Sequence, residues 1–410
     1  MREAGCNFDI KSWIVIMSID IPTRKQNIKS LRSMHSLSSC LDISLGDLNE
    51  ARALTSELRY KKKEVKKING DTRDVYDPHQ LIRRIQKRIN NRIFKPLIIW
   101  PNYIYGSVPT NKEEKKLGIE RHYIACAKQH CKAKTILKVD IKSFFDNIHK
   151  DIVRDIFNRV FKFKGDALEY LTDICCYEHR IVQGALTSSY IASLCLFDLE
   201  ADVVNRTRRK QLTYTRLVDD ITVSSPLVNF DMSQILEHIK NMLAQKDLPV
   251  NESKTQVYNI STESLKVHGL RISFNEPRLP SDEVGRIRAS VHNLEGLAKK
   301  NNSLTSVAYR VEFNRCVGRV NKLGRVKHKK YKTLSDKLRL IQPKAAKRDL
   351  SKIERAICFL ENSYLGGNSK KHYYKKKYDL ALFNLIILRR TAAYISFADG
   401  FKARLSKIKY

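Results

Sequence analysis

Acidic residues are scarce in this sequence of 410 residues. It holds 43 Asp and Glu against 77 Lys and Arg, which leaves a formal charge of +34. Such an excess of one sign destabilises a compact chain by self-repulsion, so the composition favours a polyanionic partner, either a nucleic acid or an anionic membrane surface. The hydrophobic fraction of 42% and the aromatic fraction of 9% are near the globular average and exclude disorder throughout.

Long apolar runs are also missing. The densest, residues 380–388, contains Asn384 and precedes Arg389 and Arg390, whereas a membrane-spanning helix needs about 20 apolar residues. The stretch 10–21 is interrupted by charge and lacks the basic lead and cleavage site of a secretory signal. We therefore expect a cytoplasmic protein without a membrane partner.

The cysteines do not follow a metal-binding or disulfide pattern. They number nine, and none forms a Cys-x-x-Cys pair, so neither a disulfide framework nor a four-cysteine zinc site is indicated. Cys175 and Cys176 lie in an apolar helical stretch and are expected in the core. At roughly 100–200 residues per domain, the length allows two to four domains.

Basic residues are concentrated in two regions. Around residues 58–78, Lys61, Lys62, Lys63 and Arg73 flank Asn69–Gly70, a dipeptide that favours a tight turn between two strands. Residues 79–94 alternate apolar and basic positions at helical spacing. Residues 281–410 show helical periods only and hold 31 Lys and Arg against 10 Asp and Glu. By composition, this last segment is the main polyanion-facing part.

Three aspartates are candidates for catalysis. Asp219 and Asp220 lie between apolar β-type flanks, which predicts a hairpin whose turn presents both carboxylates. Alone, an Asp–Asp pair is ordinary turn chemistry. Asp140 ends an earlier hydrophobic strand and adds the third carboxylate that chemistry with two metal ions needs.

In their order along the chain these motifs resemble the palm of a reverse transcriptase. Asp140 matches the first catalytic aspartate, and Val218-Asp219-Asp220 resembles the box that holds the other two. Three further elements match: Gln183–Gly184, which would contact template and incoming nucleotide; Asn251-Glu252-Ser253-Lys254-Thr255, whose lysine would approach pyrophosphate; and His268-Gly269-Leu270, which resembles the primer grip. The match covers roughly residues 58–345.

Bacterial retron-like and defence-associated enzymes, including the unknown-group and abortive-infection-related ones, are the most similar members. Cys126-Ala127-x-x-His130 resembles the retron Asn-Ala-x-x-His element, and Val267-His268-Gly269 resembles the retron Val-Thr-Gly element. Cys126 stands in place of Asn and His268 in place of Thr. His130 and His268 can each be a core hydrogen-bonding group or a functional one, and no spacing supports either as a metal ligand.

The resemblance implies an α+β, right-hand polymerase with fingers, palm and thumb. The expected segments are a helical lead-in at 1–57, fingers at 58–135, a palm at 136–280 with a finger insertion near 147–180, a helical thumb at 281–345 and a basic helical extension at 346–410.

Each candidate residue has an expected role. Asp140, Asp219 and Asp220 would hold two Mg²⁺ ions, because an incoming triphosphate adds negative charge to a site that already holds three carboxylates. Lys254 would protonate pyrophosphate. The remaining candidates bind substrate or nucleic acid: Arg73, Lys62 and Lys63 at the triphosphate, Gln183 and Gly184 beside it, and His268, Gly269, Arg325, Lys327, Lys329 and Lys330 on template and primer.

Phe145 is the candidate for sugar selection. It follows Asp140 by five residues, at the end of the same predicted strand, so its ring would lie under the ribose and exclude a 2′-hydroxyl. Phe144 would point the other way, into the core.

The leading interpretation is an RNA-directed DNA polymerase. It would copy a cognate structured non-coding RNA into cDNA from dNTPs, in phage defence, with an accessory effector protein as a candidate partner. The alternatives are a template-independent or protein-primed DNA polymerase of abortive-infection type and a maturase-like RNA-binding protein.

The C-terminal segment carries its own expectation. Lys370, Lys371 and residues 375–377 interleave with Tyr373, Tyr374 and Tyr378, a mixture suited to phosphate contact and base stacking. Truncation near residue 345 is expected to weaken RNA binding, unless the segment is a packing element with a solvated lysine face.

Overall fold

The computed structural model describes residues 30–66, 70, 72–110 and 112–410. The chain separates into two compact units, one ending at Pro277 and the next beginning at Arg278. Within the described part of the chain, every helix is too short or too polar to cross a membrane. The predicted division into fingers, palm, thumb and extension stays a prediction.

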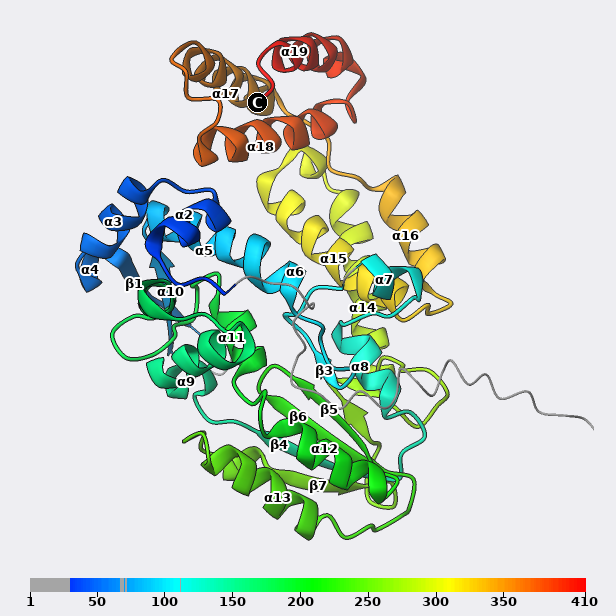
Figure 1. Ribbon diagram of the computed structural model, residues 1–410. Coiled ribbons are helices and arrows are strands. Elements are labelled where there is room, and N and C mark those ends of the chain that lie inside the picture. The colour runs from blue at the N-terminus through cyan, green and yellow to red at the C-terminus, as the bar shows by residue number, and fades with distance from the viewer. Residues whose placement is uncertain (1–29, 67–69, 71, 111) are drawn as a thin grey trace, which may run out of the picture. The chain divides into compact units, whose positions relative to one another are not determined.

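The first unit combines helices with strands (Figure 1). Its helices include two π-helical turns, η1 and η3, and two short 3-10 turns, η2 and η4. They are α2 (Met34–Leu41), α3 (Leu45–Ala53), α4 (Ser56–Arg59), α5 (Gln80–Ile89), η1 (Asn90–Phe94), α6 (Lys95–Leu97), α7 (Lys112–Lys116), α8 (Tyr123–Gln129), η2 (Phe144–Asn147), α9 (Lys150–Asp155), η3 (Ile156–Val160), α10 (Gly165–Cys175), α11 (Ser188–Leu194), α12 (Glu200–Arg209), α13 (Ser233–Ala244) and η4 (Glu252–Lys254).

Two strands form the predicted basic hairpin, which is confirmed. β1 (Tyr60–Lys66) and β2 (Thr72–Pro78) pair antiparallel. Gly70 has a φ of +93°, which glycine adopts without strain, while Asn69 lies outside the described residues. The helix predicted over 79–94 is present as α5, although it ends in the π-helical turn η1.

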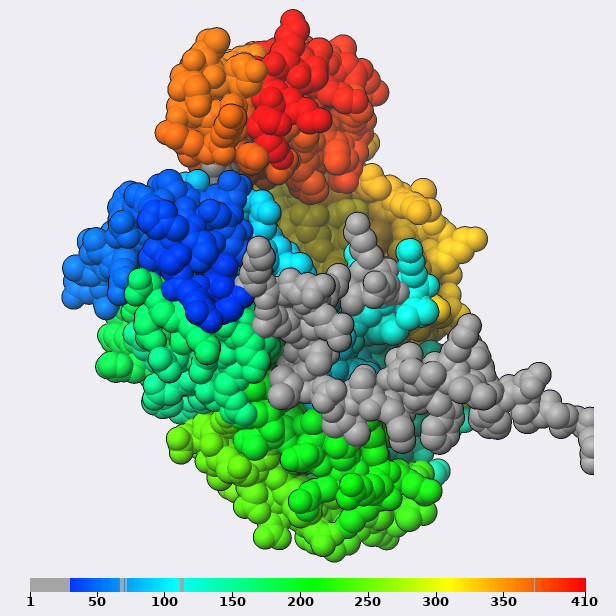
Figure 2. All heavy atoms as spheres, in the orientation of Figure 1, coloured from blue at the N-terminus to red at the C-terminus, as the bar shows by residue number. Residues whose placement is uncertain are grey.

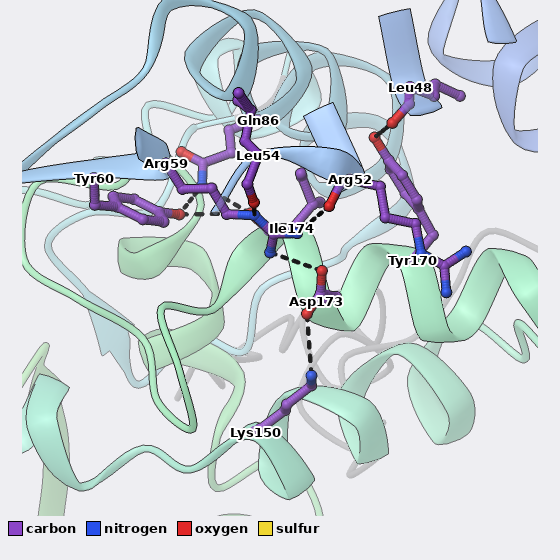
Figure 3. Close-up of polar contacts among 10 residues, drawn as sticks. All are labelled: Leu48, Arg52, Leu54, Arg59, Tyr60, Gln86, Lys150, Tyr170, Asp173 and Ile174. Carbon is purple, nitrogen blue, oxygen red and sulfur yellow. Dashed lines mark hydrogen bonds and ion pairs between the residues drawn. The ribbon is translucent and has the colours of Figure 1, made fainter. Parts of the chain in front are cut away.

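Buried polar groups anchor the base of this hairpin (Figure 3). Arg59 donates to Asp173 of α10 at 2.7 Å. Gln86 of α5 is fully buried and donates to the Tyr60 hydroxyl at 2.7 Å and to the carbonyl of Ile174 at 3.1 Å. Because buried polar groups without partners are costly, this network favours one arrangement of α5, β1 and α10.

A five-stranded sheet forms the centre of the first unit, in the order β3-β5-β6-β4-β7. Only β3 and β5 run parallel, and Figure 1 shows α12 and α13 together on one side of the sheet. The strands are β3 (Ile104–Tyr105), β4 (Thr135–Asp140), β5 (Thr213–Leu217), β6 (Asp220–Ser225) and β7 (Gln256–Asn259), and β8 (Lys266–Val267) and β9 (Leu270–Arg271) form a separate small hairpin.

Two sequence predictions need correction here. Helical spacing of apolar residues over 187–205 predicts a single helix there, but the structure has two, because α11 ends at Leu194 and α12 begins only at Glu200. The predicted Asp–Asp hairpin is present, but its two-residue turn is Val218–Asp219, and Asp220 already belongs to β6.

The described residues of the second unit are helical and contain no strand. The elements are α14 (Ser281–Ala298), η5 (Ser303–Thr305), α15 (Val307–Arg325), α16 (Tyr331–Leu340), α17 (Lys347–Leu365), α18 (His372–Leu388), η6 (Ala392–Tyr394) and α19 (Ile395–Lys407).

Helices α17 to α19 enclose a hydrophobic core of their own and form a rounded lobe, orange to red in Figure 2. Tyr374 and Tyr378 are buried in this core, and their hydroxyls donate to the carbonyls of Ile408 and Leu405 at 2.6 and 3.0 Å. The prediction that these two tyrosines stack on bases is therefore wrong, because helical periodicity turns them inward. Of the three, only Tyr373 is exposed.

Candidate active site

The register of the central sheet places two aspartates side by side. Asp140 closes β4 and Asp220 opens β6, and the two are directly opposite in the antiparallel ladder. Asp219 precedes Asp220 in the turn, and its carbonyl accepts a hydrogen bond from the Ile141 amide at 3.3 Å. All three predicted carboxylates thus lie at one edge of the sheet.

The turn that presents Asp219 is strained. Val218 has a φ of +61°, in the left-handed region that β-branched residues avoid. Its side chain packs against Gly106, where an added Cβ would lie 2.9 Å from Val218 Cγ2. Strain of this kind persists only where the surroundings enforce it, and it is concentrated at functional sites.

A buried ion pair supports this turn, because its arginine donates a hydrogen bond to a carbonyl of the turn. Arg216 of β5 is fully buried and donates to the two carboxylate oxygens of Glu200 at 2.6 and 2.8 Å. It also donates to the carbonyls of Val218 at 3.2 Å and Ser193 at 2.9 Å. Sequence analysis missed Arg216, although a single arginine inside an apolar strand was a usable signal.

Asn251 and Lys254 contact the Asp140 carboxylate. The side-chain nitrogen Nδ2 of Asn251 donates to Asp140 Oδ2 at 2.9 Å, and the backbone N–H of Asn251 donates to the backbone carbonyl of Asp140 at 2.8 Å. Lys254 Nζ lies 3.2 Å from the same Oδ2 on an exposed side chain. Lys254 therefore lies beside the Asp140 carboxylate, and its contact with pyrophosphate stays a prediction. Asn251 is a further residue of the site, which the motif contained but sequence analysis did not assign.

Negative charge accumulates at this edge. Partial burial raises the pKa of Asp220 to about 6, and the charges of Asp219 and Asp140 add to the shift. Burial and Asp140 also raise the pKa of Asp219, against the opposing effect of Lys254 and Arg73. Crowded carboxylates of this kind are stabilised by a bound cation.

This donor set fits Mg²⁺, which takes oxygen ligands and usually combines one or two carboxylates with water and substrate phosphates. Among the residues that the structure describes, no three His, Cys, Asp or Glu side chains form a ready-made ion site. Metal ions at this edge would therefore need ligands from substrate and water as well.

The β1–β2 hairpin groups Arg73 with Lys63. Arg73 is close enough to Asp219 to affect its pKa. Side chains alternate along a strand, so the pairing of Val65 with Arg73 places Lys63 on the same face as Arg73. Lys62 is on the opposite face and pairs with Asp74 at 2.9 Å. Of the two predicted lysines, only Lys63 shares the face of Arg73.

Gln183 and Gly184 form a turn against the β1–β2 hairpin. The Tyr76 amide of β2 donates to the Gln183 carbonyl at 2.7 Å. Gly184 has a φ of +107°, and an added Cβ would lie 2.1 Å from the Tyr76 carbonyl oxygen. Any larger residue would push the hairpin away, so these two residues set the position of β2.

Phe144 and Phe145 follow Asp140 in the 3-10 turn η2. The prediction that Phe145 ends the same strand is wrong, because β4 ends at Asp140 and Ser143 has a φ of +47°. Phe144 is nonetheless 3% exposed and Phe145 only partly buried at the edge of the core. The turn, and not strand alternation, separates the two rings.

His268 and Gly269 form the turn of the β8–β9 hairpin, with φ values of +48° and +78°. The His268 side chain is 9% exposed and lies beside Asp220, with Nδ1 3.7 Å from Asp220 Oδ2. The ring of His268 is therefore largely buried, and its predicted contact with nucleic acid stays a prediction. Gly269 is exposed.

His130 is a core hydrogen-bonding group. It is 1% exposed, and its ring nitrogens each lie 2.7 Å from a hydroxyl, Nδ1 from Ser224 and Nε2 from Thr215. This placement decides the alternative that the sequence left open for His130.

The predicted basic residues of the second unit lie where α15 ends and in the loop before α16. Arg325, Lys327 and Lys329 are exposed. Lys330 lines a hollow of about 620 Å³ together with Arg288, His292 and Lys337. Their contact with nucleic acid stays a prediction.

Comparison with known proteins agrees with this geometry. A family profile described as reverse transcriptase (RNA-dependent DNA polymerase) matches residues 60–278. The chain is 52% identical over 388 residues to the Retron Ec48 reverse transcriptase of Escherichia coli, with 95% of each chain covered. It is 31% identical over 266 residues to the Retron Se72 reverse transcriptase of Salmonella heidelberg, covering 63% of this chain and 66% of that protein.

The palm fold and its profile match define a polymerase that copies RNA into DNA. More narrowly, the chain belongs to the retron reverse transcriptases. The predicted α+β polymerase fold and the predicted RNA-directed DNA polymerase activity are confirmed.

Proposed function

We propose that Asp140, Asp219 and Asp220 catalyse deoxynucleotide transfer with two Mg²⁺ ions. The observation that carries this proposal is the β4–β6 register, which sets Asp140 opposite Asp220 with Asp219 adjacent. When bound, the ions lower the pKa of the primer hydroxyl and offset the charge of the triphosphate. The protein contributes position and charge complementarity.

The surrounding residues orient these carboxylates and the substrate. Asn251 fixes one oxygen of Asp140, and Lys254 neutralises the same carboxylate until substrate arrives. Lys254 is then within reach of the leaving pyrophosphate as a proton donor. Arg73, whose fork suits phosphate, and Lys63 hold the triphosphate from the fingers hairpin. Phe145 lies under the sugar.

The template in this proposal is a structured non-coding RNA. The relatives are named as retron reverse transcriptases, and the net charge of +34 supplies the affinity for a polyanion. We further propose that the enzyme acts in the bacterial cytoplasm in defence against phage, with an accessory effector protein as partner.

Sequencing the nucleic acid that co-purifies with the protein tests this. The parent and the Asp219→Ala/Asp220→Ala variant are purified from cells side by side. We expect one defined small RNA with both proteins and complementary DNA with the parent only. DNA with no matching RNA would instead favour the template-independent alternative, and DNA in equal amount with both proteins would remove the catalytic assignment.

A further inference from the structure

The two residues that depart from the retron pattern touch each other behind the catalytic carboxylates. Cys126 Sγ, on α8, lies 3.3 Å from His268 Nε2. In the retron elements these positions are Asn and Thr. Their direct contact lets the thiol of one set the position of the ring proton of the other.

This pair is one end of a polar chain that runs through the palm interior. Cys126 Sγ also lies 3.2 Å from Thr215 Oγ1, which lies 2.7 Å from His130 Nε2. Cys126, Thr215 and His130 are at most 1% exposed. At the far end, His130 Nδ1 lies 2.7 Å from Ser224 Oγ of β6. At the near end, the other ring nitrogen of His268 faces Asp220, so the chain leads from β6 through β5 and α8 to a catalytic carboxylate.

The protons of such a chain can be arranged in two directions, because thiol and hydroxyl protons rotate. In one, Cys126 donates to Thr215 and His268 carries its proton on Nε2. Its bare Nδ1 then faces Asp220 Oδ2, and two acceptors repel. In the other, the thiol proton of Cys126 turns from Thr215 Oγ1, to which the structure has it donate, to His268 Nε2. The His268 proton is then on Nδ1, and Thr215 can donate to Cys126 Sγ. An ionised Asp220 selects this second direction.

We propose that His268 is a positioning residue for Asp220, with its Nδ1–H tautomer fixed by Cys126. The Nδ1–Oδ2 distance of 3.7 Å exceeds a hydrogen bond, so the proposal requires the Asp220 side chain, which is half exposed, to rotate toward Nδ1. His268 then orients the carboxylate toward the metal ions, as partners of metal-binding carboxylates do. This inference rests on the proposed role of Asp220.

The first test needs no catalysis. Imidazole ¹⁵N spectra of the metal-free parent protein at pH 7.5 report the tautomer of each histidine, and the signal lost in His268→Asn assigns His268. We expect a neutral ring with its proton on Nδ1. A proton on Nε2 overturns the proposal, whatever the activity of the enzyme.

The second test compares isosteric pairs. His268→Asn keeps a donor near the Nδ1 position and suits the left-handed turn, whereas His268→Gly suits the turn but removes the donor. Cys126→Ser keeps a hydrogen-bonding group, and Cys126→Ala removes it. We expect His268→Gly and Cys126→Ala to lose about tenfold in kcat and in affinity for Mg²⁺ measured by calorimetry. Their melting temperatures should equal those of the matched variants His268→Asn and Cys126→Ser.

His268→Asn and Cys126→Ser should stay within about threefold of the parent, since outer-shell losses are usually tenfold or more. Equal kcat and Mg²⁺ affinity within either pair overturns the proposal. Failure of the proposed function is distinguishable, because in that case the parent itself would not extend primers in a metal-dependent way, while the tautomer result would be unaffected.

Discussion

Phe145 is the residue whose replacement should change substrate choice. Phe145→Ala should admit ribonucleotides with modest loss of deoxynucleotide use, because it removes a steric block without touching the carboxylates. Primer extension with each dNTP and rNTP measures the ratio. A variant that rejects ribonucleotides as strongly as the parent would refute the role of Phe145 in sugar selection.

Phe144→Ala is the matched control. This ring is 3% exposed in the core, so its removal should lower the free energy of unfolding by about 3–5 kcal/mol. Sugar selectivity should stay at the parent value in whatever fraction remains folded.

The Arg216–Glu200 pair should show strong energetic coupling. Arg216→Met leaves the buried carboxylate of Glu200 without its ion-pair partner, which typically lowers the free energy of unfolding by about 3–5 kcal/mol. The double variant Arg216→Met/Glu200→Gln leaves no unpaired charge and should be less destabilised than the sum of the two single variants. Denaturant unfolding of the parent, the two single variants and the double variant measures the coupling energy. Additive losses of unfolding free energy would contradict the coupling of Arg216 with Glu200.

At the scale of elements, Gly184 fixes the distance between its loop and β2. Gly184→Ala should raise the KM for dNTP, because a Cβ 2.1 Å from the Tyr76 carbonyl displaces the hairpin that carries Arg73. Steady-state kinetics measure it. Gly70→Ala is the control, since Gly70 is also in the left-handed region, with a φ of +93°, but has nothing within 4 Å of an added Cβ. Equal KM values for the two variants would contradict this role.

The sequence predicted those elements that depend on local signals. The basic hairpin and helix α5 follow from turn chemistry and helical spacing over a few residues. The break between α11 and α12 and the 3-10 turn at Phe144 do not, because tertiary packing overrides periodicity there. The position of Asp140 at the end of a strand also followed from a local signal. The resemblance of the motifs to a reverse transcriptase indicated Asp219 and Asp220 as the other two carboxylates.

The supporting contacts of the site could not be predicted. Asn251 and Asp140 are separated by 111 residues, and Cys126 and His268 by 142. Periodicity indicates which face of an element is buried, but not which distant side chain meets it. For the same reason the inward direction of His268, Tyr374 and Tyr378 became visible only in the fold.

At the scale of the whole molecule, the basic surface should bind RNA through charge. Five exposed lysines of the second unit, Lys370, Lys371, Lys375, Lys376 and Lys377, can be replaced by Gln without disturbing the buried Tyr374 and Tyr378. We expect weaker RNA binding and a shallower dependence of affinity on salt, by up to about 0.7 in log–log slope per lost phosphate contact. Unchanged affinity and slope would identify a solvated lysine face.

Nucleotide incorporation by carboxylate variants is the most direct test of the central claim that three aspartates at one sheet edge make this chain an RNA-directed DNA polymerase. Asp140→Asn and Asp219→Ala/Asp220→Ala are compared with the parent in primer extension on an RNA template with Mg²⁺, and RNA binding is measured on the same preparations. We expect both variants to bind RNA as the parent does and to incorporate no nucleotide, because amides and methyl groups cannot balance the charge of two cations. Incorporation at the parent rate by either variant would contradict it.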